Sequence, residues 1–173
     1  MRQLLLMRHA KAAAAAAGQS DRDRPLNEAG RQSVALIRAA MNDLGLAPDL
    51  VLVSRSRRTL ETLGALEPWA ETPLVETLEE LYLASALTVR AMVNAVPETV
   101  RSVLLIGHNP GLHAFASGLH DGGPAPASAL NRLADGFPTS ALAEFAVPGA
   151  WWQLDARRAR LVRFLVPSAL AAE

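Results

Sequence analysis

Three short apolar runs, each followed at once by polar residues, constrain the fold of this chain more than any other feature. They span residues 3–7, 50–53 and 103–106. Short runs of this kind, rich in Leu and Val, are typical of buried strands in a parallel sheet. The segments between the runs carry apolar residues at helical spacing. Alternating strands and helices indicate a parallel or mixed sheet that helices cover on both faces.

Residues typical of helix ends support this alternation. Asn27 can cap a helix that Gly45 ends, and a second helix is expected to begin near Arg57. A further helix is predicted over residues 85–96, and Pro110 suits the first turn of another.

The C-terminal part of the chain changes character. Residues 141–147 and 160–166 are short β-like runs separated by a turn, and we expect them to be edge strands. The length of 173 residues fits a single domain over residues 1–173. The predicted fold is a three-layer α/β/α domain with a mostly parallel central sheet.

Composition excludes several classes of protein. Acidic and basic residues number 17 each, so the net charge gives no reason to expect binding to nucleic acid or to an anionic membrane. Cysteine is absent, which excludes disulfides, zinc–thiolate sites and cysteine nucleophiles. No apolar run is long enough for a signal peptide or a membrane span. We expect a cytoplasmic monomer without a cofactor.

A cluster of residues suited to binding phosphate follows each of the three apolar runs. These clusters are Arg8-His9, then Arg55, Arg57 and Arg58, then Gly107-His108-Asn109. Ligands of open α/β sheets bind at the carboxyl ends of the strands, so the clusters should meet in space. Guanidinium groups and helix starts there would bind an oxyanion. Without cysteine and without a cluster at metal-ligand spacing, histidine is the best available nucleophile.

The three clusters resemble three motifs of one enzyme family. Residues 7–11, Met-Arg-His-Ala-Lys, look like the Arg-His-Gly signature of the histidine phosphatase superfamily, in the form typical of SixA-like phosphohistidine phosphatases. Residues 54–62 are similar to the second motif, with Arg58 and Thr62 at its Arg and Thr positions. Residues 104–111 resemble the third motif, which carries a second pocket histidine.

Two shorter segments, residues 23–30 and Pro138-Thr139, also match the SixA-like branch, so the resemblance spans nearly the whole chain in order. It implies a phosphoglycerate-mutase-like fold. The chain departs from the family's usual pattern at Ser54-Arg55-Ser56, where Ser-Pro-Ala is usual. It departs again at the alanine run of residues 12–17, which we expect to form a loop.

The resemblance assigns roles to the clustered residues. His9 would be the nucleophile and would carry the phosphoryl group as a covalent phosphohistidine. Nearby guanidinium charge disfavours the imidazolium form, which lowers the pKa of the His9 side chain. Arg8, Arg58 and His108 would hold the nonbridging oxygens, with Asn109 as a further phosphate contact and no metal ion.

The general acid and the substrate depend on one another. Glu80 is the candidate acid, with Glu79 adjacent, although both could belong to a solvated acidic turn. An alkoxide leaving group needs such an acid, whereas imidazole, whose conjugate acid has a pKa near ~6.5, does not. The expected activity is therefore a metal-independent phosphatase for phosphohistidine on a partner protein. The alternatives are a phosphomonoesterase for small phosphorylated substrates or phosphoserine with Glu80 as acid, and a non-catalytic phosphate-binding module.

Overall fold

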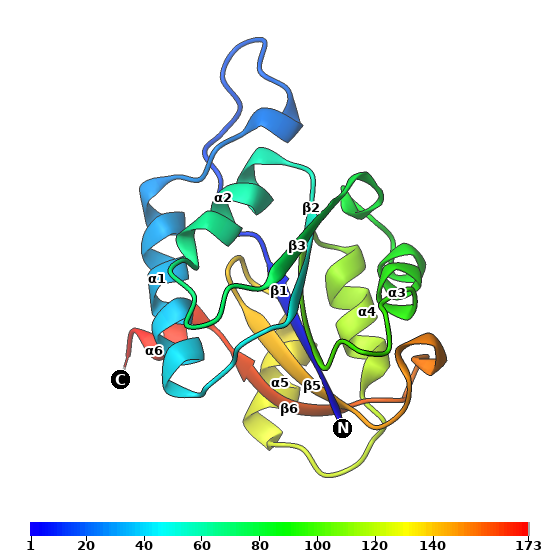
Figure 1. The fold of residues 1–173 in the computed structure, drawn as a ribbon. Helices are drawn as coiled ribbons and strands as arrows, with labels where there is room; N and C mark the ends of the chain where they lie inside the picture. The colour runs from blue at the N-terminus through cyan, green and yellow to red at the C-terminus, as the bar shows by residue number, and fades with distance from the viewer. Residues whose placement is uncertain (173) are drawn as a thin grey trace.

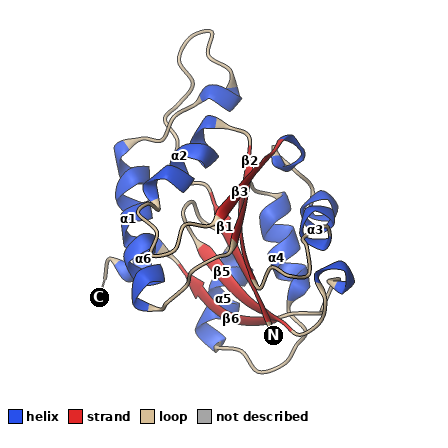
Figure 2. Ribbon diagram, in the orientation of Figure 1, coloured by secondary structure: helices blue, strands red, loops and turns tan. Residues whose placement is uncertain are grey.

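The computed structural model describes residues 1–172 as one six-stranded sheet with helices on both faces (Figure 1). The strands are β1 (Arg2–Arg8), β2 (Leu50–Ser54), β3 (Leu74–Leu78), β4 (Ser102–Gly107), β5 (Leu142–Val147) and β6 (Arg160–Leu165). Their order is β3-β2-β4-β1-β5-β6. The first four are mutually parallel, and β5 and β6 continue the sheet in antiparallel fashion (Figure 2).

Six helices and three single-turn 3₁₀ helices connect the strands. They are α1 (Glu28–Asp43), α2 (Arg57–Ala65), α3 (Ala86–Asn94), α4 (Gly111–Leu119), α5 (Ala127–Asp135) and α6 (Pro167–Leu170), with η1 (Asp21–Asp23), η2 (Glu79–Leu81) and η3 (Trp151–Gln153). Helices α1, α2 and α6 cover one face of the sheet and α3, α4 and α5 cover the other (Figure 1). Within residues 1–172 no helix is both long and apolar enough to cross a membrane.

The two faces of the sheet bury separate apolar clusters because side chains alternate along each strand. Leu4 and Leu6 of β1 pack under α3, α4 and α5, whereas Leu5 and Met7 pack under α1 and α2. All four side chains are fully buried. A central parallel strand buried on both sides reads as a continuous apolar run, which is why β1, β2 and β4 were evident from the sequence.

Local sequence fixes the starts of the helices nearest the site. The Asn27 side chain accepts a hydrogen bond from the Gly30 backbone and caps α1, as expected. Ser56 and Thr59 form a reciprocal capping box at the start of α2. Gly45, with a φ of +66°, follows the end of α1 and supplies the left-handed conformation that glycine favours. The capping box of Ser56 and Thr59 lies in the turn from β2 to α2, which carries Arg57 and Arg58.

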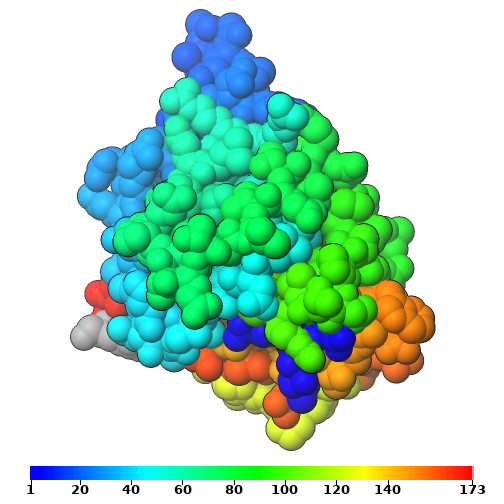
Figure 3. Space-filling view, viewed as in Figure 1, coloured from blue at the N-terminus to red at the C-terminus, as the bar shows by residue number. Residues whose placement is uncertain are grey.

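The mixed sheet and the three layers confirm the predicted fold class, with three differences in detail. Strand β3 was not predicted, because its residues are mostly exposed and no apolar run marks it. Helix α5 was likewise missed. Strand β5 was expected at an edge but lies between β1 and β6, so only β6 is an edge strand on that side. The alanine run forms a loop, as expected, within the segment around η1 that projects beyond the body of the molecule (Figure 3).

Candidate functional site

A pocket of about 510 Å³ opens where β1 and β4 end and α2 begins. Its lining comes from every cluster that the sequence placed at a strand end, from the loop around η1, and from single residues after η2 and before β5. The residues are Arg8, His9, Lys11, Ala12, Asp21, Arg24, Arg58, Leu83, His108, Asn109 and Thr139. The convergence follows from topology, because the carboxyl ends of parallel strands share one edge of the sheet.

His9 lies directly after β1 and is only 9% exposed. Its Nδ1 lies 2.7 Å from the carbonyl oxygen of Ala10. Because a carbonyl can only accept a hydrogen bond, Nδ1 carries the hydrogen and Nε2 presents a lone pair. Burial, followed by the charges of Arg58 and Arg8, lowers the pKa of His9 to about 4, although its bond to Ala10 acts in the opposite direction. The imidazole is therefore neutral at pH 7.

His108 follows β4 and is 3% exposed, with its ring centroid 5.3 Å from that of His9. Its Nε2 lies 2.7 Å from the Ser54 hydroxyl at the end of β2, and its Nδ1 lies 3.4 Å from Nη2 of Arg58. Burial and the neighbouring His9 and Arg58 lower the pKa of His108 to about 3. Because a guanidinium can only donate, Nδ1 of His108 accepts from Arg58, and Nε2 carries the hydrogen that the Ser54 hydroxyl accepts.

Two of the four cationic side chains that line the pocket, those of Arg8 and Arg58, come from the clusters at the strand ends. Arg58, in the first turn of α2, is 3% exposed although it is charged. Arg8 donates through Nη1 to the Phe137 carbonyl, and the Asn109 amide donates to the same oxygen at 2.9 Å. Nε of Arg8 and Oδ1 of Asn109 are buried without a partner among residues 1–172. Burial, together with the charge of Arg58, lowers the pKa of Arg8.

A carboxylate that the sequence did not single out lies in the same pocket. Asp21 of η1 accepts hydrogen bonds from Arg58 and Arg24 and from the Tyr82 hydroxyl. The Tyr82 hydroxyl, followed by Arg24, holds the pKa of Asp21 well below its usual range. Sequence reasoning missed Asp21 because it lies in a loop rather than after a strand. The only signal nearby was the matching segment that begins two residues later, at Asp23.

The candidate acids lie outside this pocket. Glu79 and Glu80 belong to η2, both are exposed, and neither is among the lining residues. Glu79 is instead paired with Arg22 and with Arg55, which lies 3.5 Å away. The expectation that Glu80 reaches the reacting group therefore finds no support in the geometry.

The other two arginine candidates also lie apart from the pocket. Arg55 and Arg57 are exposed, and Arg57 pairs with Glu61 at 3.0 Å. Of the three arginines that follow β2, only Arg58 points inward, because it occupies the buried face of α2. No group of three or more His, Cys, Asp or Glu side chains that could hold a metal ion occurs within residues 1–172.

The site thus combines two neutral imidazoles with the buried guanidinium of Arg58 and the half-buried one of Arg8, an arrangement suited to binding an oxyanion beside an imidazole nitrogen that has a free lone pair. The positive charges are fixed before any ligand arrives, so they need not reorganise as negative charge develops.

The chain is similar in sequence and in structure to known members of one enzyme family. The family model described as histidine phosphatase superfamily (branch 1) matches residues 4–86. An uncharacterized Mycobacterium tuberculosis protein, Rv1276c, is 34% identical over 93% of this chain and 99% of its own length. A SixA-like protein of Agrobacterium tumefaciens is 35% identical, with a TM-score of 0.81 over 96% of this chain and 98% of that one. The protein histidine phosphatase SixA complexed with tungstate is 27% identical, with a TM-score of 0.76 over 97% and 99%.

Fold, site and relatives together define a phosphatase, and the chain belongs to the histidine phosphatase superfamily. Within that superfamily it is a member of the SixA-like branch, with the phosphoglycerate-mutase-like fold of that branch.

Proposed function

We propose that this chain is a phosphohistidine phosphatase that acts on a phosphorylated histidine of a partner protein through a phosphoenzyme formed on His9. The observation that carries the proposal is the pairing of a neutral His9 with a pocket in which Asp21, the only lining carboxylate among residues 1–172, is ionised. Such a site has a nucleophile and an oxyanion clamp but no protonated carboxyl group. It suits a leaving group that departs without help from an acid.

The proposed reaction has two steps. Nε2 of His9 attacks phosphorus and the bond to the substrate nitrogen breaks. A substrate ring already protonated at its other nitrogen then departs as neutral imidazole. Water next attacks phosphorus on His9, its proton passes to solvent, and inorganic phosphate leaves. Arg8 and Arg58 stabilise the nonbridging oxygens throughout. His108 accepts from Arg58 through Nδ1 and so helps to hold that guanidinium in place.

The proposal is tested by comparing hydrolysis of a phosphohistidine peptide with hydrolysis of phosphoserine and of an aryl phosphate, each with and without EDTA. We expect the phosphohistidine peptide to be cleaved far faster than phosphoserine, without dependence on a metal ion. His9→Gln should lower the rate to below about a thousandth of wild type, because the covalent route is lost. Brief incubation with labelled substrate should leave labelled phosphate on wild-type protein but not on His9→Gln.

Glu80→Gln distinguishes this proposal from an ester-specific phosphatase. The variant should cleave the phosphohistidine peptide as fast as wild type does, because Glu80 does not line the pocket. Rapid phosphoserine hydrolysis that Glu80→Gln abolishes would establish the phosphomonoesterase instead. Phosphate binding without any turnover in wild type would indicate a non-catalytic module.

A further inference from the structure

The pocket contains a contact that the proposed reaction does not use, between Asp21 and Arg58. Asp21 approaches both terminal nitrogens of the Arg58 guanidinium. Its carboxylate Oδ2 accepts from Nη2 at 3.0 Å, and its main-chain carbonyl oxygen accepts from Nη1 at 2.8 Å. Two acceptors from one residue fix the plane of the guanidinium as well as its position. Arg58 keeps further N–H groups, since a guanidinium has five.

The same carboxylate is anchored on its other side. Asp21 also accepts a hydrogen bond from the Tyr82 hydroxyl, and its Oδ1 lies 3.0 Å from Nη1 of Arg24. The Tyr82 ring packs edge-on against His108, with 5.4 Å between ring centroids. Asp21 therefore connects three segments that are distant in sequence: the loop around η1, the first turn of α2, and the residue that follows η2.

The exposures of the two partners differ sharply. The Arg58 side chain is 4% exposed, whereas that of Asp21 is 47% exposed. A buried guanidinium charge is costly unless it is hydrogen-bonded, and Asp21 supplies two acceptors from the solvent side. Asp21 is thus placed to determine where the Arg58 charge lies relative to His9 before any ligand enters.

We propose that Asp21 is a positioning residue that orients Arg58 to bind the phosphoryl oxygens, an inference that rests on the proposed function. Without Asp21 the long Arg58 side chain would sample other rotamers, and a bound anion would have to order it. The opposite effect is also physically possible, since the Asp21 carboxylate repels a phosphate dianion. The phosphate affinity of Asp21→Ala therefore distinguishes the two effects. It falls if Asp21 orients Arg58, and it rises if Asp21 repels the anion.

The experiment measures binding of inorganic phosphate by calorimetry, and kcat and KM for the phosphohistidine peptide, in wild type and in Asp21→Ala. We expect phosphate affinity and kcat/KM each to fall about tenfold in Asp21→Ala. The value of kcat should also fall, because the contact between Arg58 and the phosphoryl oxygens strengthens as negative charge develops in the transition state. Asp21→Asn should recover much of the loss, since its side-chain oxygen can still accept from Nη2. In an Arg58→Ala background, Asp21→Ala should cause no further loss of phosphate affinity.

Asp23→Ala is the matched control. Asp23 belongs to the same short helix, accepts from the Ser20 hydroxyl at 2.7 Å and does not line the pocket. This variant removes one carboxylate from η1 but should leave both phosphate affinity and kcat unchanged. Thermal unfolding of each variant checks that the loop change does not unfold the domain.

Two outcomes would overturn the inference. Tighter phosphate binding in Asp21→Ala with an unchanged kcat would show that Asp21 competes with the anion rather than orienting Arg58. Equal losses in Asp21→Ala and Asp23→Ala would show that the loop as a whole, not the contact with Arg58, matters. In either case an inactive His9→Gln would leave the proposed function standing, whereas a fully active His9→Gln would remove its basis.

Discussion

The two pocket histidines stay neutral because burial withholds water from them and because they lie among guanidinium groups. Neither effect requires a carboxylate partner, and both favour the unprotonated ring. An uncharged His9 has a free lone pair at neutral pH, as the proposed nucleophile requires. The same arrangement costs stability in acid, where the unfolded chain binds protons that the folded chain does not.

This cost gives a prediction for stability against pH. The pKa values of His9 and His108 fall from 6.5 to about 4 and about 3 on folding, so folding is favoured above pH 6.5 and weakened as the pH falls toward 4. The free energy of unfolding, measured with urea, should drop by up to about 1.4 kcal/mol per pH unit for each histidine in that range. Below pH 3.8 the ionised Asp21 adds a further loss.

The glutamine variants of the two histidines test this origin. His9→Gln and His108→Gln should each flatten the dependence between pH 6.5 and 4, and the double variant should flatten it most. An unchanged slope in the double variant would mean that other groups bind the protons. Measurements at pH 8, where the unfolded chain no longer binds these protons, provide the common reference.

At the scale of single residues, the sequence identified those residues whose position follows from a strand end. Arg8, His9 and His108 each come at or directly after a strand of the parallel sheet, where topology alone brings side chains together. Asp21 could not be found in this way, because no periodicity predicts where a loop returns. Glu80 was selected because the family resemblance implies a Glu near the strand ends, and in the structure its side chain is exposed.

The helix that follows the third cluster is held close to a neighbouring segment. A Cβ built on Gly111, the first residue of α4, would lie 1.8 Å from the carbonyl oxygen of Ala84. That contact is with backbone, which cannot turn aside as a side chain can. His108 lies three residues earlier, and its carbonyl oxygen accepts from the Leu112 amide at 3.0 Å. The close approach therefore helps to fix the position of His108.

Gly111→Ala should consequently destabilise the protein and impair the site together. We expect a loss of about 1–3 kcal/mol in the free energy of unfolding, because α4 must move away from Ala84. Phosphate affinity should fall as His108 moves with the start of the helix. The measurements are urea unfolding and calorimetric titration with inorganic phosphate.

Gly118→Ala is the control within the same helix. A Cβ at Gly118 meets nothing within 4 Å, so the higher helix propensity of alanine should stabilise the protein by roughly 0.5–1 kcal/mol. Phosphate affinity should not change. If both alanine variants behaved alike, the close contact at Ala84 would not be what positions α4.

Elements differ in how well the sequence predicted them, and the difference follows burial. Strands β1, β2 and β4 are buried on both faces and read as apolar runs. Strand β3 has four exposed residues of five and takes its conformation from pairing with β2, which no local pattern reveals. An apolar run thus predicts a strand that is buried in the core. It does not predict an exposed strand whose conformation depends on hydrogen bonds from its neighbour.

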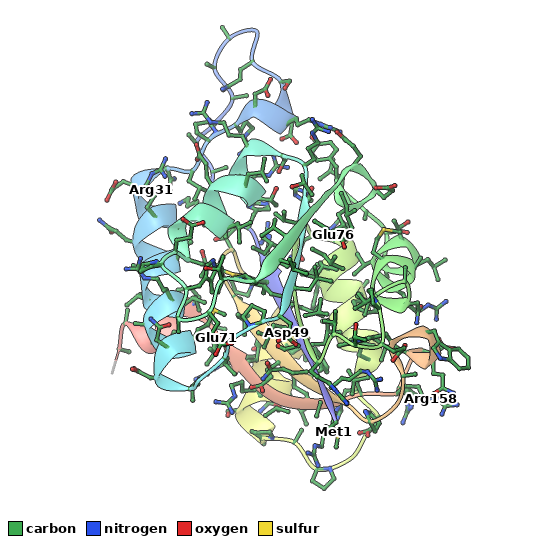
Figure 4. All side chains as sticks on the ribbon, in the orientation of Figure 1. Met1, Arg31, Asp49, Glu71, Glu76 and Arg158 are labelled. Atoms are coloured by element: carbon green, nitrogen blue, oxygen red, sulfur yellow. The ribbon has the colours of Figure 1, made fainter. Side chains whose placement is uncertain are left out.

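At the scale of the whole molecule, β3 leaves one edge of the sheet open. No strand among residues 1–172 pairs with its outer side, and Leu74 and Val75 on it are 72% and 48% exposed. An unpaired edge invites another chain to add a strand. Glu76 lies at the centre of β3, as Figure 4 shows, so antiparallel pairing of two copies about this residue would oppose two carboxylates. This repulsion should disfavour pairing of two copies along β3.

Removing that charge should therefore promote association. Glu76→Val is expected to give a concentration-dependent increase in mass by light scattering after gel filtration, whereas wild type stays at one mass. Glu71→Val is the control, because Glu71 is also exposed but lies in the loop before β3 (Figure 4). Association of both variants to the same degree would point to general hydrophobicity rather than to the edge.

The sequence by itself determined the layered α/β architecture, the family, and the residues at the ends of the buried strands. It could do so because burial on both faces of a parallel sheet imposes apolar runs. The residues that follow these runs then lie together, because the carboxyl ends of parallel strands share one edge of the sheet. Only the tertiary structure decided which arginine faces the pocket, where the loop returns with Asp21, and that Glu80 lies outside. Those outcomes depend on contacts between segments distant in sequence, which no local pattern encodes.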